Sequence, residues 1–192
     1  MQVKRTLDII ISLIALAILF LPILIISFLI FLDLKSNPIF IQHRNGINGS
    51  KFPMLKFRTM NVKEDGINSF SQAMPNDNRV TKLGAFLRKN SIDELLQFIN
   101  VFLGHMSIVG PRPHPISLDL HFENKISNYM DRYNVKPGIT GLAQVTGFRG
   151  ETDTLEKMQG RINADFKYIK NQSTYLDIKI FFKTFLVLFK GV

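Results

Sequence analysis

The sequence contains no cysteine among its 192 residues. This absence excludes disulfides, thiolate nucleophiles, Cys-ligated zinc and iron–sulfur clusters. Histidine is also scarce: the four histidines show no zinc-like pairing. Acidic residues are outnumbered, with 15 Asp and Glu against 24 Lys and Arg, so the formal charge is +9 and the pI is near 9.9. The length indicates one main body, and the charge favours an anionic partner.

A long apolar run lies near the start of the chain. Residues 9–32 form 24 consecutive uncharged positions, of which 21 are apolar. As a straight helix, such a run reaches roughly 36 Å, slightly more than the ~30 Å hydrocarbon thickness of a bilayer. A signal peptide fits less well, because the run is too long and no small-residue cleavage site follows. The run therefore predicts a membrane segment.

Pro22 divides this segment into apolar arms of 13 and 10 residues, each too short to span a bilayer. Lys4 and Arg5 precede the run and Lys35 follows it, so the distribution of cations indicates no orientation. Two paths remain open on these residues alone: a kinked span, and a helix broken at Pro22 that leaves the membrane on the side where it entered.

The remainder of the chain predicts a mixed, mainly helical body. Short β-like runs on either side of the turn-rich segment 45–50 predict a hairpin. Ser91 and Glu94 are spaced as a capping box and predict a helix that continues to Phe102. Further helices are expected over 119–133 and 154–170, with an amphipathic helix over 175–190. Residues 61–79 are polar and indicate a loop.

Two segments hold candidate chemistry. Asp93 and Glu94 follow Arg88 and a Lys, in a predicted first helical turn where free N–H groups attract anions. An Asp there can act as a nucleophile or bind Mg²⁺, although routine helix capping explains the same pair. Arg112 lies between two prolines that limit its orientation, as a phosphate clamp requires, but a plain surface turn is the alternative.

A third candidate is the Gly-punctuated segment 141–150, which can place Arg149 and backbone N–H groups around a phosphate. It has neither a Walker pattern nor the Rossmann glycine spacing. Lys56 adds a cation close to the membrane segment, where contact with lipid headgroups is an equal explanation. His105 and His114 are expected to be structural, because no Ser or carboxylate is spaced to form a triad with them.

Taken together, these segments resemble the monotopic phosphoglycosyl transferases, bacterial sugar transferases that load a sugar phosphate onto a polyprenyl phosphate. The resemblance covers nearly the whole chain. Besides the Pro-broken apolar segment, the matching stretches are Gln42-x-Arg44-x-Gly46, Lys56–Met60, Arg79–Gly84, Leu87–Lys89, Ser91–Leu95, Met106–Pro113, Lys136–Gly141 and Arg149–Thr152.

The resemblance implies an α+β, mainly helical fold with a re-entrant membrane helix hinged at Pro22 (residues 1–36) and a cytoplasmic catalytic body at the membrane surface (37–192). It implies transfer of a sugar 1-phosphate from a UDP-sugar to undecaprenyl phosphate, with release of UMP, through a covalent aspartyl intermediate. Asp93 is then the nucleophile and a Mg²⁺ ligand, and Glu94 supports the metal or helps to deprotonate the lipid phosphate. The implied phosphate or nucleotide contacts are Lys56, Arg88, Arg112 and Arg149.

The implied location is the cytoplasmic face of the bacterial inner membrane, and a homodimer is one candidate assembly. The segment 148–154 is most similar to members that transfer glucose or galactose 1-phosphate in exopolysaccharide, O-antigen or glycoprotein glycan assembly. The chain departs from the family pattern at Leu96, where a Pro is frequent, at His105, where an acidic or small polar residue is common, and at Leu142, where a Trp is frequent.

Two other functions are weighed against the enzyme. A non-catalytic membrane adaptor would use the basic face to bind acidic partners or anionic lipid, would need no Mg²⁺ and would tolerate Asp93→Asn. Nucleic-acid binding has only the net charge in its favour, and the membrane segment argues against it.

Overall fold

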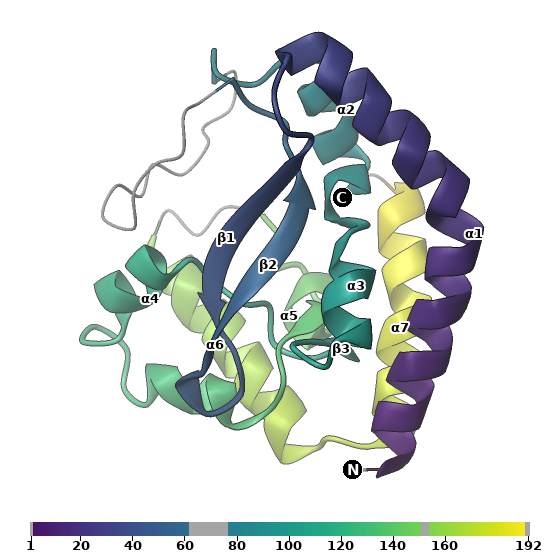
Figure 1. The fold of residues 1–192 in the computed structure, drawn as a ribbon. Helices are drawn as coiled ribbons and strands as arrows, with labels where there is room; N and C mark the ends of the chain where they lie inside the picture. The colour runs from purple at the N-terminus through teal and green to yellow at the C-terminus, as the bar shows by residue number, and fades with distance from the viewer. Residues whose placement is uncertain (1, 62–76, 151–153, 191–192) are drawn as a thin grey trace.

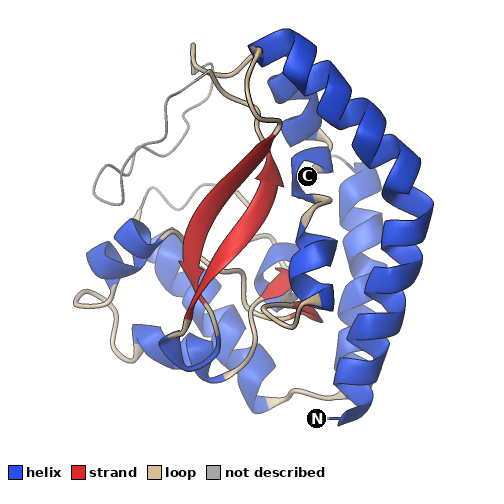
Figure 2. Ribbon diagram, viewed as in Figure 1, coloured by secondary structure: helices blue, strands red, loops and turns tan. Residues whose placement is uncertain are grey.

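The computed structural model describes residues 2–61, 77–150 and 154–190. Helices dominate this part of the chain, together with two small two-stranded sheets (Figure 2). The predicted mainly helical α+β class is therefore confirmed. In chain order the elements are α1 (Gln2–Leu34), β1 (Ile39–Asn45), η1 (Ile47–Gly49), β2 (Lys51–Phe57), α2 (Lys82–Lys89), η2 (Ile92–Glu94), α3 (Gln97–Phe102), β3 (Ser107–Val109), α4 (Ile116–Phe122), η3 (Tyr129–Asn134), β4 (Gly138–Thr140), α5 (Leu142–Val145), α6 (Leu155–Lys170) and α7 (Thr174–Lys190).

The apolar run forms most of α1, a helix of 33 residues that lies along one side of the molecule (Figure 1). Among the described residues, it is the one helix long and apolar enough to cross a membrane. Helix α1 continues through Pro22 as one helix, so the re-entrant hinge at this residue stays a prediction. Ile23 and Ile26, just beyond the proline, pack on the body and hold the second half of the helix in place.

Polar contacts attach the beginning of α1 to the body. The Lys4 ammonium donates to the Val109 carbonyl at 2.9 Å and pairs with Asp177 of α7 at 2.7 Å. Asp8 is buried and accepts hydrogen bonds from the Ser107 hydroxyl at 3.0 Å and the Ile108 amide at 2.9 Å. The end of α1 is attached by apolar packing instead, because Ile30 is buried in a cluster of side chains from β2, α2 and the segment before α3.

The predicted hairpin is confirmed. Strands β1 and β2 are antiparallel, with Ile39 opposite Phe57 and Asn45 opposite Lys51. The turn includes Gly49 at φ 73°, in the left-handed region that glycine adopts without steric cost. Phe52 and Met54 of β2, two residues apart on one face of the hairpin, are buried, so this face packs on the helices.

A second sheet, which the sequence did not predict, pairs β3 with β4 in parallel. The two segments approach each other so closely just beyond β3 that a Cβ on Gly138 would lie 2.1 Å from the amide nitrogen of Gly110. This pairing holds the segment that begins at Pro111 next to the segment 138–144. Residues from two distant parts of the sequence therefore meet at one place.

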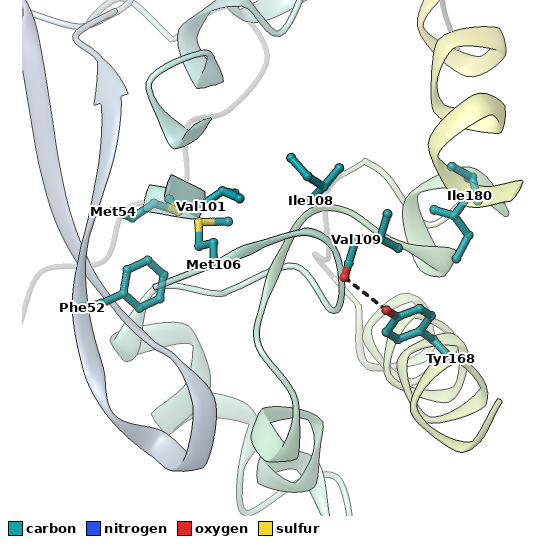
Figure 3. Packing of buried hydrophobic residues seen from close by; sticks show 9 residues of the cluster. Phe52, Met54, Val101, Met106, Ile108, Val109, Tyr168 and Ile180 are labelled. Atoms are coloured by element: carbon teal, nitrogen blue, oxygen red, sulfur yellow. Dashed lines mark hydrogen bonds between the residues drawn. The ribbon is translucent and has the colours of Figure 1, made fainter. Parts of the chain in front are cut away.

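The main core connects the hairpin to the C-terminal helices (Figure 3). The hydroxyl of Tyr168, on α6, donates to the Val109 carbonyl at 3.1 Å within this core. Its buried members are Phe52, Met54, Val101, Met106, Ile108, Val109, Val145, Tyr168 and Ile180.

The prediction of a helix that begins at Ser91 is wrong for its first residues. Ser91 has φ 56° and makes no capping hydrogen bond; a 3-10 turn over Ile92–Glu94 follows, and α3 begins only at Gln97. The region 119–133 also differs, because α4 ends at Phe122 and a 3-10 helix begins at Tyr129.

The two C-terminal helices agree with prediction. Thr154 caps α6 by accepting from the Lys157 amide at 3.3 Å. Most of the predicted loop over 61–79 lies outside the described residues.

Candidate functional site

A cavity of about 550 Å³ lies where η2, the segment after β3, the β4–α5 region and α7 converge. All six residues predicted to form the site line this one cavity: Lys56, Arg88, Asp93, Glu94, Arg112 and Arg149. Four cations thus face two carboxylates, so the polar lining has a formal charge of +2. Such a lining favours an anionic ligand.

The local backbone explains how the two carboxylates reach the cavity. Helix α2 ends at Lys89, and Ser91 then adopts a left-handed conformation that turns the chain sharply. The 3-10 turn that follows presents Asp93 and Glu94 in succession. The Ser91 hydroxyl is free of any capping role and accepts a hydrogen bond from Arg149 at 2.5 Å.

Glu94 is held by two cations. Its Oε1 accepts from the Lys56 ammonium at 2.9 Å and from Nη2 of Arg112, while its Oε2 accepts from Nη1 of Arg112 at 3.0 Å. Burial alone would raise the pKa of Glu94, but the charges and hydrogen bonds of Arg112 and Lys56 outweigh burial and hold this pKa well below its usual range. Glu94 is therefore ionised, and it fixes the orientation of the Arg112 guanidinium.

Asp93 differs from Glu94 both in its hydrogen bonding and in the direction of its pKa shift. It accepts no hydrogen bond from any described residue, so both carboxylate oxygens are available. Burial raises the pKa of Asp93 and the neighbouring Glu94 charge adds to the rise, although Lys56, Arg112 and Arg88 oppose it. Two adjacent carboxylates thus differ in both hydrogen bonding and pKa, a pattern found where acid, base and nucleophile roles are divided.

Arg88 and Arg149 occupy the more open part of the site. Arg88 is exposed, and its Nη1 lies 3.4 Å from the sulfur of Met60. Arg149 is half-buried and reaches Ser91, two residues before Asp93. Neither guanidinium pairs with a carboxylate among the described residues, so both can bind an incoming anion.

Part of the cavity wall was missed by sequence reasoning. Helix α7 contributes Phe181, Thr184 and Phe185, and the Thr184 hydroxyl lies 2.7 Å from that of Thr140 on β4. The one signal in the sequence was the spacing of two aromatic residues one helical turn apart. That spacing predicts an apolar helix face, but it does not indicate what the face contacts.

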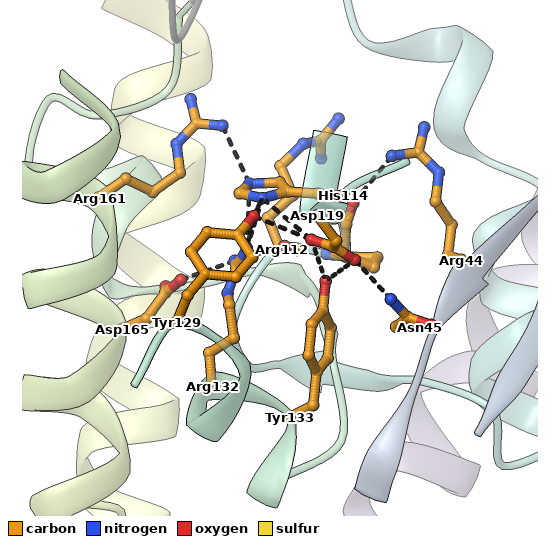
Figure 4. A network of polar contacts seen from close by, with 11 residues as sticks. Arg44, Asn45, Arg112, His114, Asp119, Tyr129, Arg132, Tyr133, Arg161 and Asp165 are labelled. Carbon is orange, nitrogen blue, oxygen red and sulfur yellow. Dashed lines mark hydrogen bonds and ion pairs between the residues drawn. The ribbon is translucent and has the colours of Figure 1, made fainter. Parts of the chain in front are cut away.

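A second polar network is buried beside the cavity (Figure 4). Arg132 and Asp165, on η3 and α6, form an ion pair at 2.7 Å with almost no exposure of either side chain. Arg132 also donates to the Arg112 carbonyl at 2.7 Å. Asp119 accepts hydrogen bonds from the hydroxyls of Tyr129 at 2.9 Å and Tyr133 at 2.7 Å. This network supports the backbone behind Arg112.

His114 belongs to this network and does not line the cavity. Its Nδ1 lies 2.6 Å from the Tyr129 hydroxyl. Burial, followed by the positive charges of Arg132 and Arg161, holds the pKa of His114 well below its usual range. The imidazole is therefore neutral at physiological pH.

The described residues contain no group of three or more His, Asp or Glu side chains that could by themselves hold a metal ion. Mg²⁺ usually binds through one or two carboxylates and substrate phosphates, and it retains several waters. The two available oxygens of Asp93 fit that mode. Glu94 fits it less well, because Lys56 and Arg112 already occupy its oxygens.

One long apolar helix thus lies beside a cavity whose lining combines four cations with two carboxylates. The profile of the bacterial sugar transferase family matches residues 1–191. The chain belongs to this family.

Three relatives illustrate the similarity. A UDP-glucose:undecaprenyl-phosphate glucose-1-phosphate transferase of Klebsiella pneumoniae is 49% identical over 191 residues, covering 100% of this chain and 40% of the relative. A transferase of the same description from Caulobacter vibrioides is 46% identical, over 94% of this chain and 67% of the relative. An exopolysaccharide production protein of Rhizobium leguminosarum is 41% identical, over 94% of this chain and 92% of the relative. The chain spans about two-fifths of the Klebsiella relative.

Proposed function

We propose that this chain transfers a sugar 1-phosphate from a UDP-sugar to undecaprenyl phosphate and releases UMP. The observation that carries the proposal is the contrast between two adjacent carboxylates in a cationic cavity. Glu94 is bound to Lys56 and Arg112, whereas Asp93 is free to react. A nucleophile needs an available electron pair, and neighbouring cations are needed to stabilise the charge on the phosphates.

In the first proposed step, a carboxylate oxygen of Asp93 attacks the β-phosphorus of the UDP-sugar. An Asp–O–P bond forms, and the bond from the β-phosphorus to the bridging oxygen breaks, so that UMP leaves with that oxygen. Arg88, Arg112 and Arg149 are the groups placed to bind the diphosphate and to stabilise its developing charge.

In the second step, an oxygen of undecaprenyl phosphate attacks the phosphorus held on Asp93. The Asp–O–P bond breaks, the carboxylate is regenerated, and the sugar is left on a polyprenyl diphosphate. Glu94 is a weak base because its pKa is well below the usual range. We therefore assign it the role of orienting Arg112 and Lys56 rather than that of accepting a proton.

We further propose Mg²⁺ as the cofactor, held by Asp93 together with substrate phosphate oxygens. When bound, the ion would neutralise charge on the diphosphate as UMP departs. The residues of this chain supply the remaining functions: cations that bind the phosphates, and a half-buried carboxylate with available oxygens.

A membrane location for this chemistry is supported by α1. Its first turns contact β3 and the end of α3, and its last turns contact the hairpin and α2. A helix that crosses the ~30 Å hydrocarbon layer leaves its ends on opposite sides. Contact of both ends with one body supports the re-entrant path, with the body on the cytoplasmic face of the inner membrane. The outward side chains of α1 and α7 that would meet lipid include Ile18, Phe20, Leu21, Phe28, Phe182 and Leu186.

For the donor, we propose UDP-glucose. The Klebsiella pneumoniae and Caulobacter vibrioides relatives are described as transferring glucose 1-phosphate. A relative from Aeromonas hydrophila, 40% identical, is described as transferring N-acetylgalactosamine phosphate. Members of the family therefore differ in the sugar, which makes a panel of donors necessary.

The test is UMP release by the purified protein in nanodiscs with Mg²⁺, undecaprenyl phosphate and a panel of UDP-sugars. We expect release with UDP-glucose, loss of release in Asp93→Asn, and retention in the control Asp131→Asn on η3. Equal release by Asp93→Asn and the wild type would contradict the nucleophile assignment. No release from any donor by folded, membrane-bound protein would favour the non-catalytic adaptor.

A further inference from the structure

Arg149 reaches the cavity from a short segment that follows α5. Gly147 has φ 100° and turns the chain out of the helix, and Phe148, Arg149 and Gly150 follow. A guanidinium binds a phosphate well only if its backbone is held, because lost conformational freedom opposes binding. The contacts that hold this segment therefore bear on the reaction.

Arg161, on α6, holds the backbone on both sides of Arg149. Its Nε donates to the Phe148 carbonyl at 3.1 Å, and its Nη2 donates to the Gly150 carbonyl at 2.6 Å. The Arg161 residue is only 6% exposed. One buried guanidinium thus bridges the two carbonyls that flank Arg149 in the chain.

The preceding residue of α6 adds a steric contact with the same segment. A Cβ on Gly160 would lie 2.3 Å from a ring carbon of Phe148, so the aromatic ring packs directly on the helix backbone. Gly160 and Arg161 together hold Phe148 and Gly150 against α6. Arg149, between them, is left to extend toward Ser91 and Asp93.

The charge environment makes a guanidinium at this position unfavourable. Burial lowers the pKa of Arg161 to about 10, and the positive charges of Arg112 and Arg132 contribute to the decrease. Burying a cation is expensive unless its donors are used well. The two shortest hydrogen bonds of Arg161 go to the two carbonyls, with a longer contact of 3.4 Å to His114 Nε2.

We propose that Arg161 is a positioning residue, which orients Arg149 toward the diphosphate of the donor by holding the carbonyls of Phe148 and Gly150. This role rests on the proposed function, because it assumes that Arg149 binds the donor. Arg161 itself is not expected to touch the substrate, since its hydrogen bonds are directed to the backbone behind Arg149.

A double-mutant cycle on UMP release tests the coupling. Arg161→Met keeps much of the side-chain volume and removes the donors, and we expect kcat/KM for the UDP-sugar to fall between about ten- and a hundred-fold. Arg149→Ala is expected to lower kcat/KM at least as far. The double variant Arg149→Ala/Arg161→Met is expected to lower it no further than Arg149→Ala alone. Lys167→Met, which removes an exposed cation from the same helix, is the matched control and should match the wild type.

Amide hydrogen exchange of the peptide containing residues 147–150 provides a readout that is independent of turnover. We expect faster exchange in Arg161→Met than in the wild type and Lys167→Met. Unchanged exchange overturns the positioning role whether or not the protein is active. Independent, multiplicative losses in the double variant also overturn it, because Arg161 would then act through something other than Arg149.

The two proposals fail in different ways. Absence of UMP release by the wild type contradicts the proposed function, and the exchange experiment still decides whether Arg161 holds the segment. Normal turnover by the wild type and Arg149→Ala, with loss in Arg161→Met, contradicts the further inference and the role of Arg149 in binding the diphosphate, but leaves the proposed reaction standing.

Discussion

Replacing Arg132 with Met should be strongly destabilising, because Arg132 is the centre of the buried network beside the cavity (Figure 4). The substitution removes a cation that pairs with Asp165 at 2.7 Å and that has no exposed surface. It leaves the Asp165 carboxylate buried without its partner, and it removes the donor to the Arg112 carbonyl.

The magnitude follows from the burial of the pair. Breaking a fully buried ion pair by removing one partner costs about 3–5 kcal/mol. For a chain of this size each kcal/mol lowers Tm by roughly 2–4 °C, so a fall of roughly 6–20 °C is expected. Thermal unfolding in detergent, followed by circular dichroism at 222 nm, measures it.

The double variant Arg132→Met/Asp165→Leu separates an unpaired charge from a general packing defect. Because it removes both charges and leaves apolar side chains, we expect it to recover a large part of the lost stability. The reasoning is refuted if Arg132→Met lowers Tm by less than about 2 °C, or if the double variant is less stable than Arg132→Met.

Three further predictions concern other parts of the molecule. His114 is neutral and buried, so it takes up a proton only on unfolding. The free energy of unfolding should therefore fall by up to about 1.4 kcal/mol per pH unit below pH 6.5, and that of His114→Gln should fall less steeply. Denaturation at several pH values measures both slopes, and equal slopes contradict the prediction. Gly138→Ala should lower the free energy of unfolding by at least about 2 kcal/mol, measured as a fall in Tm, because the added Cβ would lie 2.1 Å from the Gly110 backbone. A Cβ on Gly150 would meet nothing within 4 Å, so Gly150→Ala should retain the wild-type Tm. Glu94→Gln should lower kcat/KM for UMP release about a hundred-fold, because it releases Arg112 and Lys56. Glu156→Gln, at an exposed position, is the control. Near-wild-type activity of Glu94→Gln would contradict the orienting role.

Much of the local structure could be predicted because its causes are contiguous in the sequence. The turn residues between Asn45 and Ser50 indicated the hairpin, and the helix expected over 154–170 matches α6. Local rules failed at Ser91, where a capping-box spacing coincides with a left-handed residue. There the sharp turn after α2 and the hydrogen bond from Arg149 replace the cap, and neither is visible in the spacing.

The residues of the candidate site were predictable as residue types in motifs, but their states were not. Asp93 and Glu94 are adjacent and chemically similar, and no sequence pattern indicated that one would be held by two cations and the other left free. The contact between Lys56 and Glu94 joins residues 38 positions apart, and that between Arg149 and Ser91 joins residues 58 positions apart.

The sequence by itself determined the long apolar helix and the mainly helical class, because these depend on composition and periodicity, and the family resemblance of its motifs implied the six polar residues that line one cavity. Only the tertiary structure decided which carboxylate is available, which helix supplies the apolar wall and which buried arginine supports Arg149. Those properties depend on burial and on charges brought within hydrogen-bonding distance by the parallel β3–β4 pair and by the packing of α6 and α7 on the body.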